Sequence, residues 1–223
     1  MLVNRVRELL SQGSIWPPID VELVDAASRG LLRGTVLNAG AGLRDVRHLV
    51  DGTLVNQDLR WGPDDIRANI DIFSPLHVIP RQDDAFDAIL CIAVLEHVEN
   101  PEDVVREFRR VLRPGGHVMA SVPFLQPEHK VPTDFQRYTQ DGLCRLFSHA
   151  GFEIISVVPL FSVYHTLHWI TYEWLHLRNT TLYKALRLAL LPPLAVAARR
   201  STLQSVKLAS GFQVIARKPG AAA

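Results

Sequence analysis

Two closely spaced glycines follow a short apolar run near residue 40, and a carboxylate follows the next apolar stretch. Residues 36–42 read VLNAGAG, and Asp58 lies sixteen positions beyond Gly42. Glycine at such a turn lets the backbone approach a ligand closely, because no Cβ stands in the way. A carboxylate at this spacing can accept hydrogen bonds from ribose hydroxyls. The pattern indicates nucleotide binding at a strand end, although a GxG sequence also occurs in ordinary tight turns.

Further motifs follow in a fixed order. They are NID at 69–71, DAFDAILCIAVLEHV at 84–98, NPEDVVREFRRVLRPGG at 100–116 and HVMASVPF at 117–124. In this order the chain resembles the class I S-adenosylmethionine-dependent methyltransferases, specifically the small-molecule enzymes whose fourth strand ends in Leu-Glu-His. The resemblance covers residues 31–161 and returns at 211–218. Several linked motifs are a more specific signal than one.

The resemblance implies that S-adenosylmethionine binds at the carboxyl ends of the strands. The glycine turn would approach the methionine part, Asp58 would bind the ribose, and Asp71 with the backbone of Ile72 would contact the adenine. For Asp71 the alternative is an ordinary turn carboxylate. The residues expected to bind the cofactor are Asn38, Ala39, Gly40, Gly42, Asp58, Leu59, Asp71, Ile72, Cys91 and Ala93.

Two positions depart from the family pattern. Asn38 stands where an aspartate is usual, which keeps hydrogen bonds but removes a charge, and Arg44 stands in place of a third glycine. We expect the first change to lower cofactor affinity and interpret the second as variation within the family.

Two histidines are candidates for catalysis. His97 follows the fourth apolar strand, and its unperturbed pKa near ~6.5 suits proton transfer; alternatively, Glu96 and His97 only fix their loop. His129 lies in PFLQPEHKVPTDFQRYT at 123–139, which resembles a stretch of methyltransferases associated with glycan and natural-product pathways. The alternative for this stretch is a structural loop in which Asp134 pairs with Arg137. The residues expected to contact the acceptor are Phe124, His129, Arg137 and Tyr138.

No metal is predicted. Ubiquinone-pathway O-methyltransferases can bind a divalent metal through Glu-x-x-Glu-His, but here Ala93 occupies the position of the first Glu. His165 and His168 have metal-ligand spacing with no third ligand in register.

Composition limits the class of protein. Of 223 residues, 48% are hydrophobic and 21% charged, as in a globular chain. The 24 basic and 23 acidic side chains form no run that could follow a phosphate backbone, so nucleic acid is not an expected partner. Two cysteines, Cys91 and Cys144, suggest a reducing, cytoplasmic setting. The N-terminal residues are too charged for a signal peptide.

Helices and strands are expected to alternate, which predicts a parallel sheet with right-handed crossovers. The expected fold class is α/β: a Rossmann-like seven-stranded sheet, mostly parallel with an antiparallel last strand, helices on both faces and a helical insertion before the last strand. Helices are expected at 2–12, 20–33, 45–50, 101–112 and 140–150, and strands at 35–38, 53–58, 68–72, 86–92, 117–122, 152–158 and 212–216.

We interpret residues 1–223 as one methyltransferase domain, with N-terminal helices in 1–33 and an aromatic-rich insertion at 160–210. The insertion is expected to be a lid, a dimer contact or an interfacial helix with Arg187, Arg199 and Arg200 near lipid headgroups. Its apolar run at 188–198 is expected to be too short, and too broken by Pro192-Pro193, to span a bilayer.

The sequence thus predicts a cytoplasmic S-adenosylmethionine-dependent methyltransferase with a small-molecule, glycan or lipid-linked acceptor, and O-methylation is favoured over N-methylation. A peripheral membrane contact and a homodimer stay open. The alternative is a non-catalytic partner or regulatory subunit with the same fold. A dehydrogenase is disfavoured, because the chain lacks the second mononucleotide-binding half that a dinucleotide requires.

Overall fold

The computed structural model describes residues 29–42, 44, 46–59, 68–130 and 133–220. The helix expected at 2–12 and most of the one expected at 20–33 lie outside this part of the chain.

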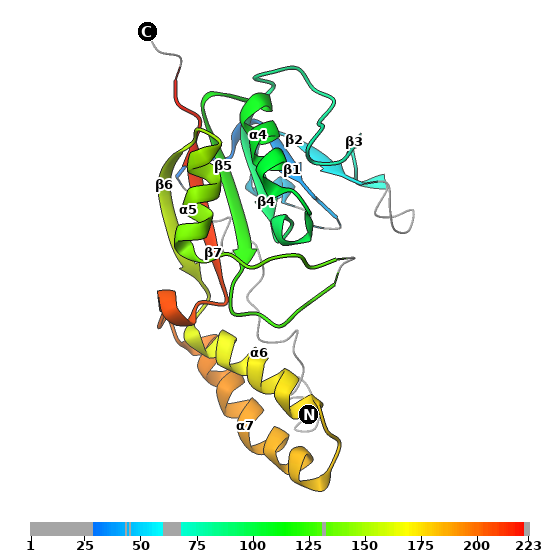
Figure 1. Cartoon of the computed structure of the whole chain (residues 1–223), viewed down its shortest axis with the longest axis vertical. Coiled ribbons are helices and arrows are strands. Elements are labelled where there is room, and N and C mark those ends of the chain that lie inside the picture. The colour runs from blue at the N-terminus through cyan, green and yellow to red at the C-terminus, as the bar shows by residue number, and fades with distance from the viewer. Residues whose placement is uncertain (1–28, 43, 45, 60–67, 131–132, 221–223) are drawn as a thin grey trace.

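A seven-stranded sheet forms the body of the protein (Figure 1). Its order is β3-β2-β1-β4-β5-β7-β6, and β7 is antiparallel to both neighbours while the other pairs from β3 to β5 are parallel. The predicted sheet class is therefore confirmed. The carboxyl ends of the parallel strands meet at one edge, where open α/β sheets bind ligands. The strands are β1 Arg33–Ala39, β2 Asp51–Asp58, β3 Ile72–Phe73, β4 Phe86–Ile92, β5 Leu112–Pro123, β6 Glu153–Leu160 and β7 Gly211–Arg217.

The third strand is shorter than expected, with two residues where 68–72 was predicted. The Asp71 carboxylate accepts a hydrogen bond from the Asn56 N–H at 2.8 Å. A side chain therefore takes a β2 donor that a longer β3 would have paired through its backbone.

Two helices, α4 Pro101–Val111 and α5 Gln140–His149, cover the same face of the sheet (Figure 1). Thr139 caps α5, because its hydroxyl accepts the Gly142 N–H at 3.1 Å. Asn100 precedes α4, where a threonine or asparagine side chain often caps, but its side chain makes no capping hydrogen bond. Pro101 at the helix start has no N–H to satisfy there.

The opposite face of the sheet buries a second apolar cluster. In the described residues this cluster is covered by the segments around Leu32 and Val46 and by the short 3-10 helix η1 Arg47–Leu49, where a helix was expected at 45–50. The sheet contributes Val36, Leu54, Ala88, Leu90, Ile92, Met119 and Ile215. Both faces of the central strands are therefore apolar, as the continuous apolar run of β4 predicts.

The insertion forms a helical hairpin of α6 Val163–His176 and α7 Thr181–Arg200, followed by the 3-10 helix η3 Val206–Leu208. The hairpin projects beyond the carboxyl end of β5 (Figure 1). The expectation that Pro192-Pro193 would break the apolar run is wrong, because α7 continues through both prolines. The prolines remove hydrogen bonds to the carbonyls of Leu188 and Ala189, and both residues are exposed, so water can donate instead.

By length and composition, α7 is the one helix in the described part of the chain that could cross a membrane, and only 17% of its apolar window is buried. Arg187 joins the two helices. Its guanidinium donates to the Leu175 carbonyl at 3.0 Å and to the Arg178 carbonyl at 2.6 Å. These acceptors lie at the end of α6, where carbonyls lack helical partners. The Arg187 side chain, which belongs to α7, is therefore bound to the end of α6. One expectation had placed it near lipid headgroups.

Phe108 tests the packing of α4 on the sheet. Its side chain is fully buried, so Phe108→Ala should lower the free energy of unfolding by about 3–5 kcal/mol, measured by urea denaturation. The control Arg106→Ala, on the exposed side of the same helix, should cost less than about 1 kcal/mol. Equal losses in the two variants would contradict this account of the core.

Candidate active site

The glycine turn after β1 is bound to the end of β2. Gly40 and Gly42 have φ values of +68° and +54°, a left-handed conformation that glycine adopts without strain. The Gly42 N–H donates to an Asp58 carboxylate oxygen at 2.8 Å, and the Leu59 N–H donates to the other oxygen at 2.7 Å. Asp58 therefore orders the turn. Each carboxylate oxygen can accept a further hydrogen bond, so the expected ribose contact is compatible with this arrangement.

The two glycines have different surroundings. A Cβ on Gly40 would come within 2.5 Å of the Val94 side chain, whereas a Cβ on Gly42 would meet no protein atom within 4 Å. Gly40 thus permits close packing against the segment after β4. Gly42, with Ala39 and Ala41 buried beside it, leaves one side of the turn open to a ligand.

Asn38 is buried at the end of β1 and donates through Nδ2 to Asn56 Oδ1 at 3.0 Å. The Asn38 Oδ1 atom has no hydrogen-bond partner among the described residues. A buried acceptor without a donor is unfavourable, and a cofactor amino group could supply the donor. The substitution of the family aspartate by Asn38 therefore retains an acceptor at this position.

The expected adenine contacts surround the ends of β2 and β3. Asp71 is exposed and accepts from Asn56, while the Ile72 side chain is buried in the core. Leu59 is 52% exposed, directly after Asp58. An exposed apolar side chain and a carboxylate at this edge fit an aromatic ring with an amino group.

The end of β4 carries strained backbone. Ala93 has a φ of +54°, which is uncommon for a residue with a Cβ, and its N–H donates to the Ser121 carbonyl at 2.9 Å. Arg44 crosses from the glycine turn to donate to the Ile92 carbonyl at 3.0 Å. Cys91 is fully buried, and burial raises the pKa of its thiol, so this thiol is not a nucleophile. Such strain concentrates at functional sites.

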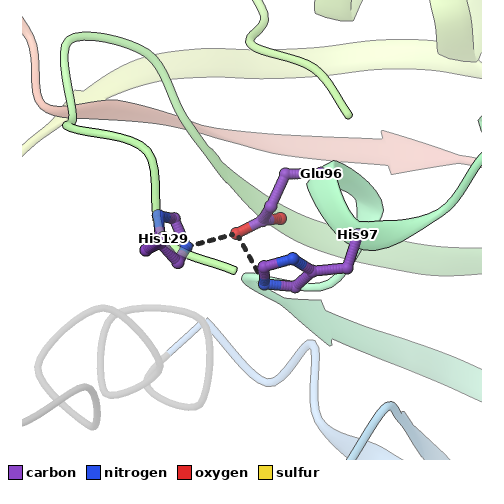
Figure 2. A group of neighbouring side chains, drawn as sticks. All are labelled: Glu96, His97 and His129. Atoms are coloured by element: carbon purple, nitrogen blue, oxygen red, sulfur yellow. Dashed lines mark ion pairs between the residues drawn. The ribbon is translucent and has the colours of Figure 1, made fainter. Parts of the chain in front are cut away.

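Directly beyond this strain, three side chains converge (Figure 2). Glu96, in the 3-10 helix η2 Leu95–His97, is fully buried, and its Oε1 atom lies 3.6 Å from His129 Nε2 and 3.8 Å from His97 Nε2. The Glu96 carboxylate raises the pKa of His129 against the opposing effect of burial. One donor atom from each residue lies within 4.8 Å of the others, so this group could hold a cation. We call it the Glu-His-His cluster.

The described residues 124–130 and 133–139 belong to the loop between β5 and α5, which we call the acceptor loop. Its segment 133–136 attaches this loop to η2. The His97 Nδ1 atom contacts the Thr133 carbonyl, and the Phe135 N–H donates to the Glu96 carbonyl at 2.8 Å. Gln136 donates to the carbonyls of Leu95 at 3.0 Å and Val98 at 2.8 Å. The loop and the end of β4 therefore form one unit. Sequence reasoning missed Gln136 and Phe135, whose contacts depend on the path of the loop.

Asp134 and Arg137 stabilise the loop itself. Arg137 forms a two-pronged ion pair with the Asp134 carboxylate, one prong of which measures 2.6 Å, and it donates to the Pro127 carbonyl at 3.1 Å. The Arg137 guanidinium lowers the pKa of Asp134 to about 2. Asp134 also accepts the His129 N–H at 2.8 Å. These contacts support the structural alternative for the pair. They bind the Arg137 guanidinium to other groups of the loop.

The other expected acceptor residues lie at the edge of the core. Phe124 packs against Phe212 with 5.4 Å between ring centroids, and Tyr138 packs against the main core. Burial raises the pKa of the Tyr138 hydroxyl, which has no hydrogen-bond partner in the described part of the chain. Trp169 of α6 lies beside the cluster, 6.1 Å from His129 between ring centroids. The hairpin therefore borders the side of the site where the acceptor is expected.

Comparison with known proteins agrees with this geometry. A family profile described as a methyltransferase domain matches residues 65–120. An uncharacterized 37.1 kDa protein in transposon TN4556 of Streptomyces fradiae is 32% identical over 105 residues, which cover 40% of this chain and 30% of that protein. The ubiquinone biosynthesis O-methyltransferase of Cupriavidus pinatubonensis is 29% identical over 92 residues, covering 41% of this chain and 36% of the enzyme. The chain thus matches about a third of the length of these relatives.

Among solved structures, the [4+2]-cyclase SpnF superimposes with a TM-score of 0.59 at 18% identity, covering 98% of this chain and 94% of SpnF. The sheet order, the glycine turn and the family match define a class I methyltransferase fold. The chain therefore has the fold of the class I S-adenosylmethionine-dependent methyltransferases, and its residues 65–120 match a methyltransferase domain.

Asp58 tests the cofactor edge. Asp58→Ala removes a charged acceptor and loosens the glycine turn, so it should weaken S-adenosylmethionine binding by about 1.5–3 kcal/mol in calorimetry. The control Asp51→Ala, at the opposite end of β2, should leave affinity unchanged. Unchanged affinity in Asp58→Ala would remove this residue from the site.

Proposed function

We propose that this chain transfers the methyl group of S-adenosylmethionine to an oxygen of a small-molecule or lipid-linked acceptor. One observation carries the proposal: the glycine turn of β1 and the Glu-His-His cluster after β4 lie at the same edge of the sheet, and Arg44 links the glycine turn to the end of β4. The cofactor and the acceptor can therefore meet over the ends of adjacent strands. The name of the Cupriavidus relative, an O-methyltransferase, supports oxygen as the nucleophile.

In this reaction the acceptor oxygen forms a bond to the methyl carbon as the carbon–sulfur bond breaks and the sulfonium becomes a thioether. The cofactor supplies the electrophile, and the protein aligns the reactants while the His97 Nε2 atom takes up the hydroxyl proton. We assign His97 and His129 as catalytic residues that contact the reacting oxygen. Their backbone-facing Nδ1 atoms leave both Nε2 atoms directed into the cluster.

The hairpin supports an acceptor with an apolar part. Trp169 borders His129, and α6 also exposes Leu167 and Ile170. We propose that α6 is the lid of the acceptor site. The exposed apolar side chains of α7 would then contact a membrane surface that holds a lipid-linked acceptor, or a second copy of this chain, with Arg199 and Arg200 at the end of the helix.

A second candidate is a protein that binds the cofactor without transferring the methyl group. The structural similarity to a [4+2]-cyclase favours keeping it, because that chain carries the same fold for other chemistry. Formation of S-adenosylhomocysteine from S-adenosylmethionine with phenolic acceptors, with and without a prenyl tail, distinguishes the two. Cofactor binding without product from the whole panel would favour the second candidate, and absence of cofactor binding would reject both.

His97 tests the catalytic assignment. His97→Ala should lower turnover by about 10²-fold or more and leave S-adenosylmethionine affinity within about twofold, because the side chain acts on the acceptor rather than the cofactor. The control His149→Ala, on the exposed end of α5, should be unaffected. Turnover within a few-fold of the parent would make His97 structural.

Trp169 tests the lid. Trp169→Ala should raise KM for the acceptor about tenfold with cofactor affinity unchanged, because the variant loses roughly 1.5 kcal/mol of aromatic contact. Trp174 of the same helix is 46% exposed and packs against Tyr183 of α7. Trp174→Ala is therefore the matched control. Equal KM values in the two variants would contradict a lid.

A further inference from the structure

We propose that Glu96, His97 and His129 form a binding site for a divalent transition-metal cation. The site combines a carboxylate and an imidazole from one end of β4 with an imidazole from the acceptor loop (Figure 2). The sequence predicted no metal because Ala93 occupies the position of the first Glu in the Glu-x-x-Glu-His motif. The structure brings a ligand from position 129 instead.

The orientation of the two imidazole rings is the first observation that supports a cation. The His97 Nδ1 atom contacts the Thr133 carbonyl, and the His129 Nδ1 atom lies 3.4 Å from the Pro127 carbonyl. Each Nδ1 atom therefore faces a backbone carbonyl, and both Nε2 atoms face the Glu96 carboxylate, at 3.8 and 3.6 Å from its Oε1 atom. With the Nδ1 proton donated to a carbonyl, each neutral ring would offer its Nε2 lone pair to a cation.

The environment of Glu96 also favours a bound cation. Its side chain is 0% exposed, and neither carboxylate oxygen has a hydrogen-bond partner among the described residues. A buried charge without a partner is costly. A cation between the Glu96 carboxylate and the two Nε2 atoms would balance that charge.

The donors and their spacing select the kind of metal. Ligand atoms bound at ~2.0–2.2 Å lie about 3–3.5 Å apart, so the two separations from Glu96 need only a small contraction, while the third separation lies within 4.8 Å. Two imidazoles and one carboxylate suit zinc, cobalt, iron or manganese, whereas magnesium prefers an all-oxygen site. Three protein ligands also leave coordination positions open.

The surroundings resemble the outer shell of a metal site. Metal-binding histidines commonly donate their second N–H to a backbone carbonyl, as both rings do here. Asp134 fixes the backbone of His129, and Gln136 fixes the backbone around Glu96 through Leu95 and Val98. These contacts hold the ligands in place without using the atoms that would bind the metal.

An open coordination position would bind the acceptor hydroxyl, so that in the metal-bound protein His97 and His129 act on the reacting oxygen through the cation and not by direct contact. A bound cation lowers the pKa of such a hydroxyl, so its proton can leave to solvent before the oxygen attacks the methyl carbon. This role of the cation in deprotonating the acceptor rests on the proposed function. Binding of the metal does not rest on it, and metal binding can be measured without an acceptor.

The test uses the full chain, stripped with a chelator and titrated with Zn²⁺ by calorimetry and with Co²⁺ by visible absorption. We expect one ion per chain and the ligand-field bands of a site with nitrogen and oxygen ligands. His129→Ala and His97→Ala should each weaken Zn²⁺ binding by more than about 100-fold and change the cobalt spectrum. His149→Ala should bind as the parent does, and equal metal-free melting curves would show that the variants fold.

Two results would overturn the proposal. One is a stripped chain that binds no stoichiometric Zn²⁺ or Co²⁺, in which case a proton shared with a histidine balances Glu96. The other is unchanged binding in His129→Ala, which would place the ion elsewhere. Calorimetry with S-adenosylmethionine in the presence of chelator separates these failures from failure of the proposed function, because the cofactor edge contains none of the three ligands.

Discussion

The buried carboxylate of Glu96 is the interaction on which the geometry of the site depends. An ionised carboxylate withdrawn from water is tolerated only when charges or donors surround it, and Glu96 has two histidine rings as its nearest polar neighbours. One ring is adjacent in sequence, and the other comes from a loop beyond β5. The acceptor loop must therefore reach the end of β4 to satisfy this charge. The cluster therefore exists only where the loop lies against the end of β4.

The end of β4 also connects the cofactor edge to the acceptor side. Ala93 bends the chain out of the strand in a left-handed conformation, and Arg44 returns from the glycine turn to the Ile92 carbonyl. Hydrogen bonds from Gln136 and Phe135 then lock the acceptor loop onto the same turn. A methyl transfer needs a fixed distance and line between nucleophile and carbon, and shared backbone contacts provide it better than independent loops.

The parts of the fold that sequence reasoning predicted well are those with local causes. The buried strand Phe86–Ile92 is a continuous apolar run, and α5 begins after a threonine cap, so both were predicted closely. The short β3 and the unbroken α7 were not, because each depends on a contact or an exposure that the local pattern does not contain. For the site, residue types located the glycine turn and both histidines. The meeting of His129 with Glu96 depends on how the loop crosses the sheet edge.

Hydrogen bonds anchor the start of α6 and close the far end of the hairpin, and this arrangement limits the acceptor. His165 completes the cap at the start of α6 with Ser162, Thr166 donates to the Leu208 carbonyl at 2.8 Å, and Arg187 closes the far end. These contacts fix α6 at both ends, so Trp169 stays beside His129. A molecule bound there would meet a charged cluster on one side and an apolar helix on the other. An acceptor that fits both surfaces has its reacting oxygen at one end and an apolar body along the helix, and this agrees better with a phenolic or lipid-linked compound than with a free sugar.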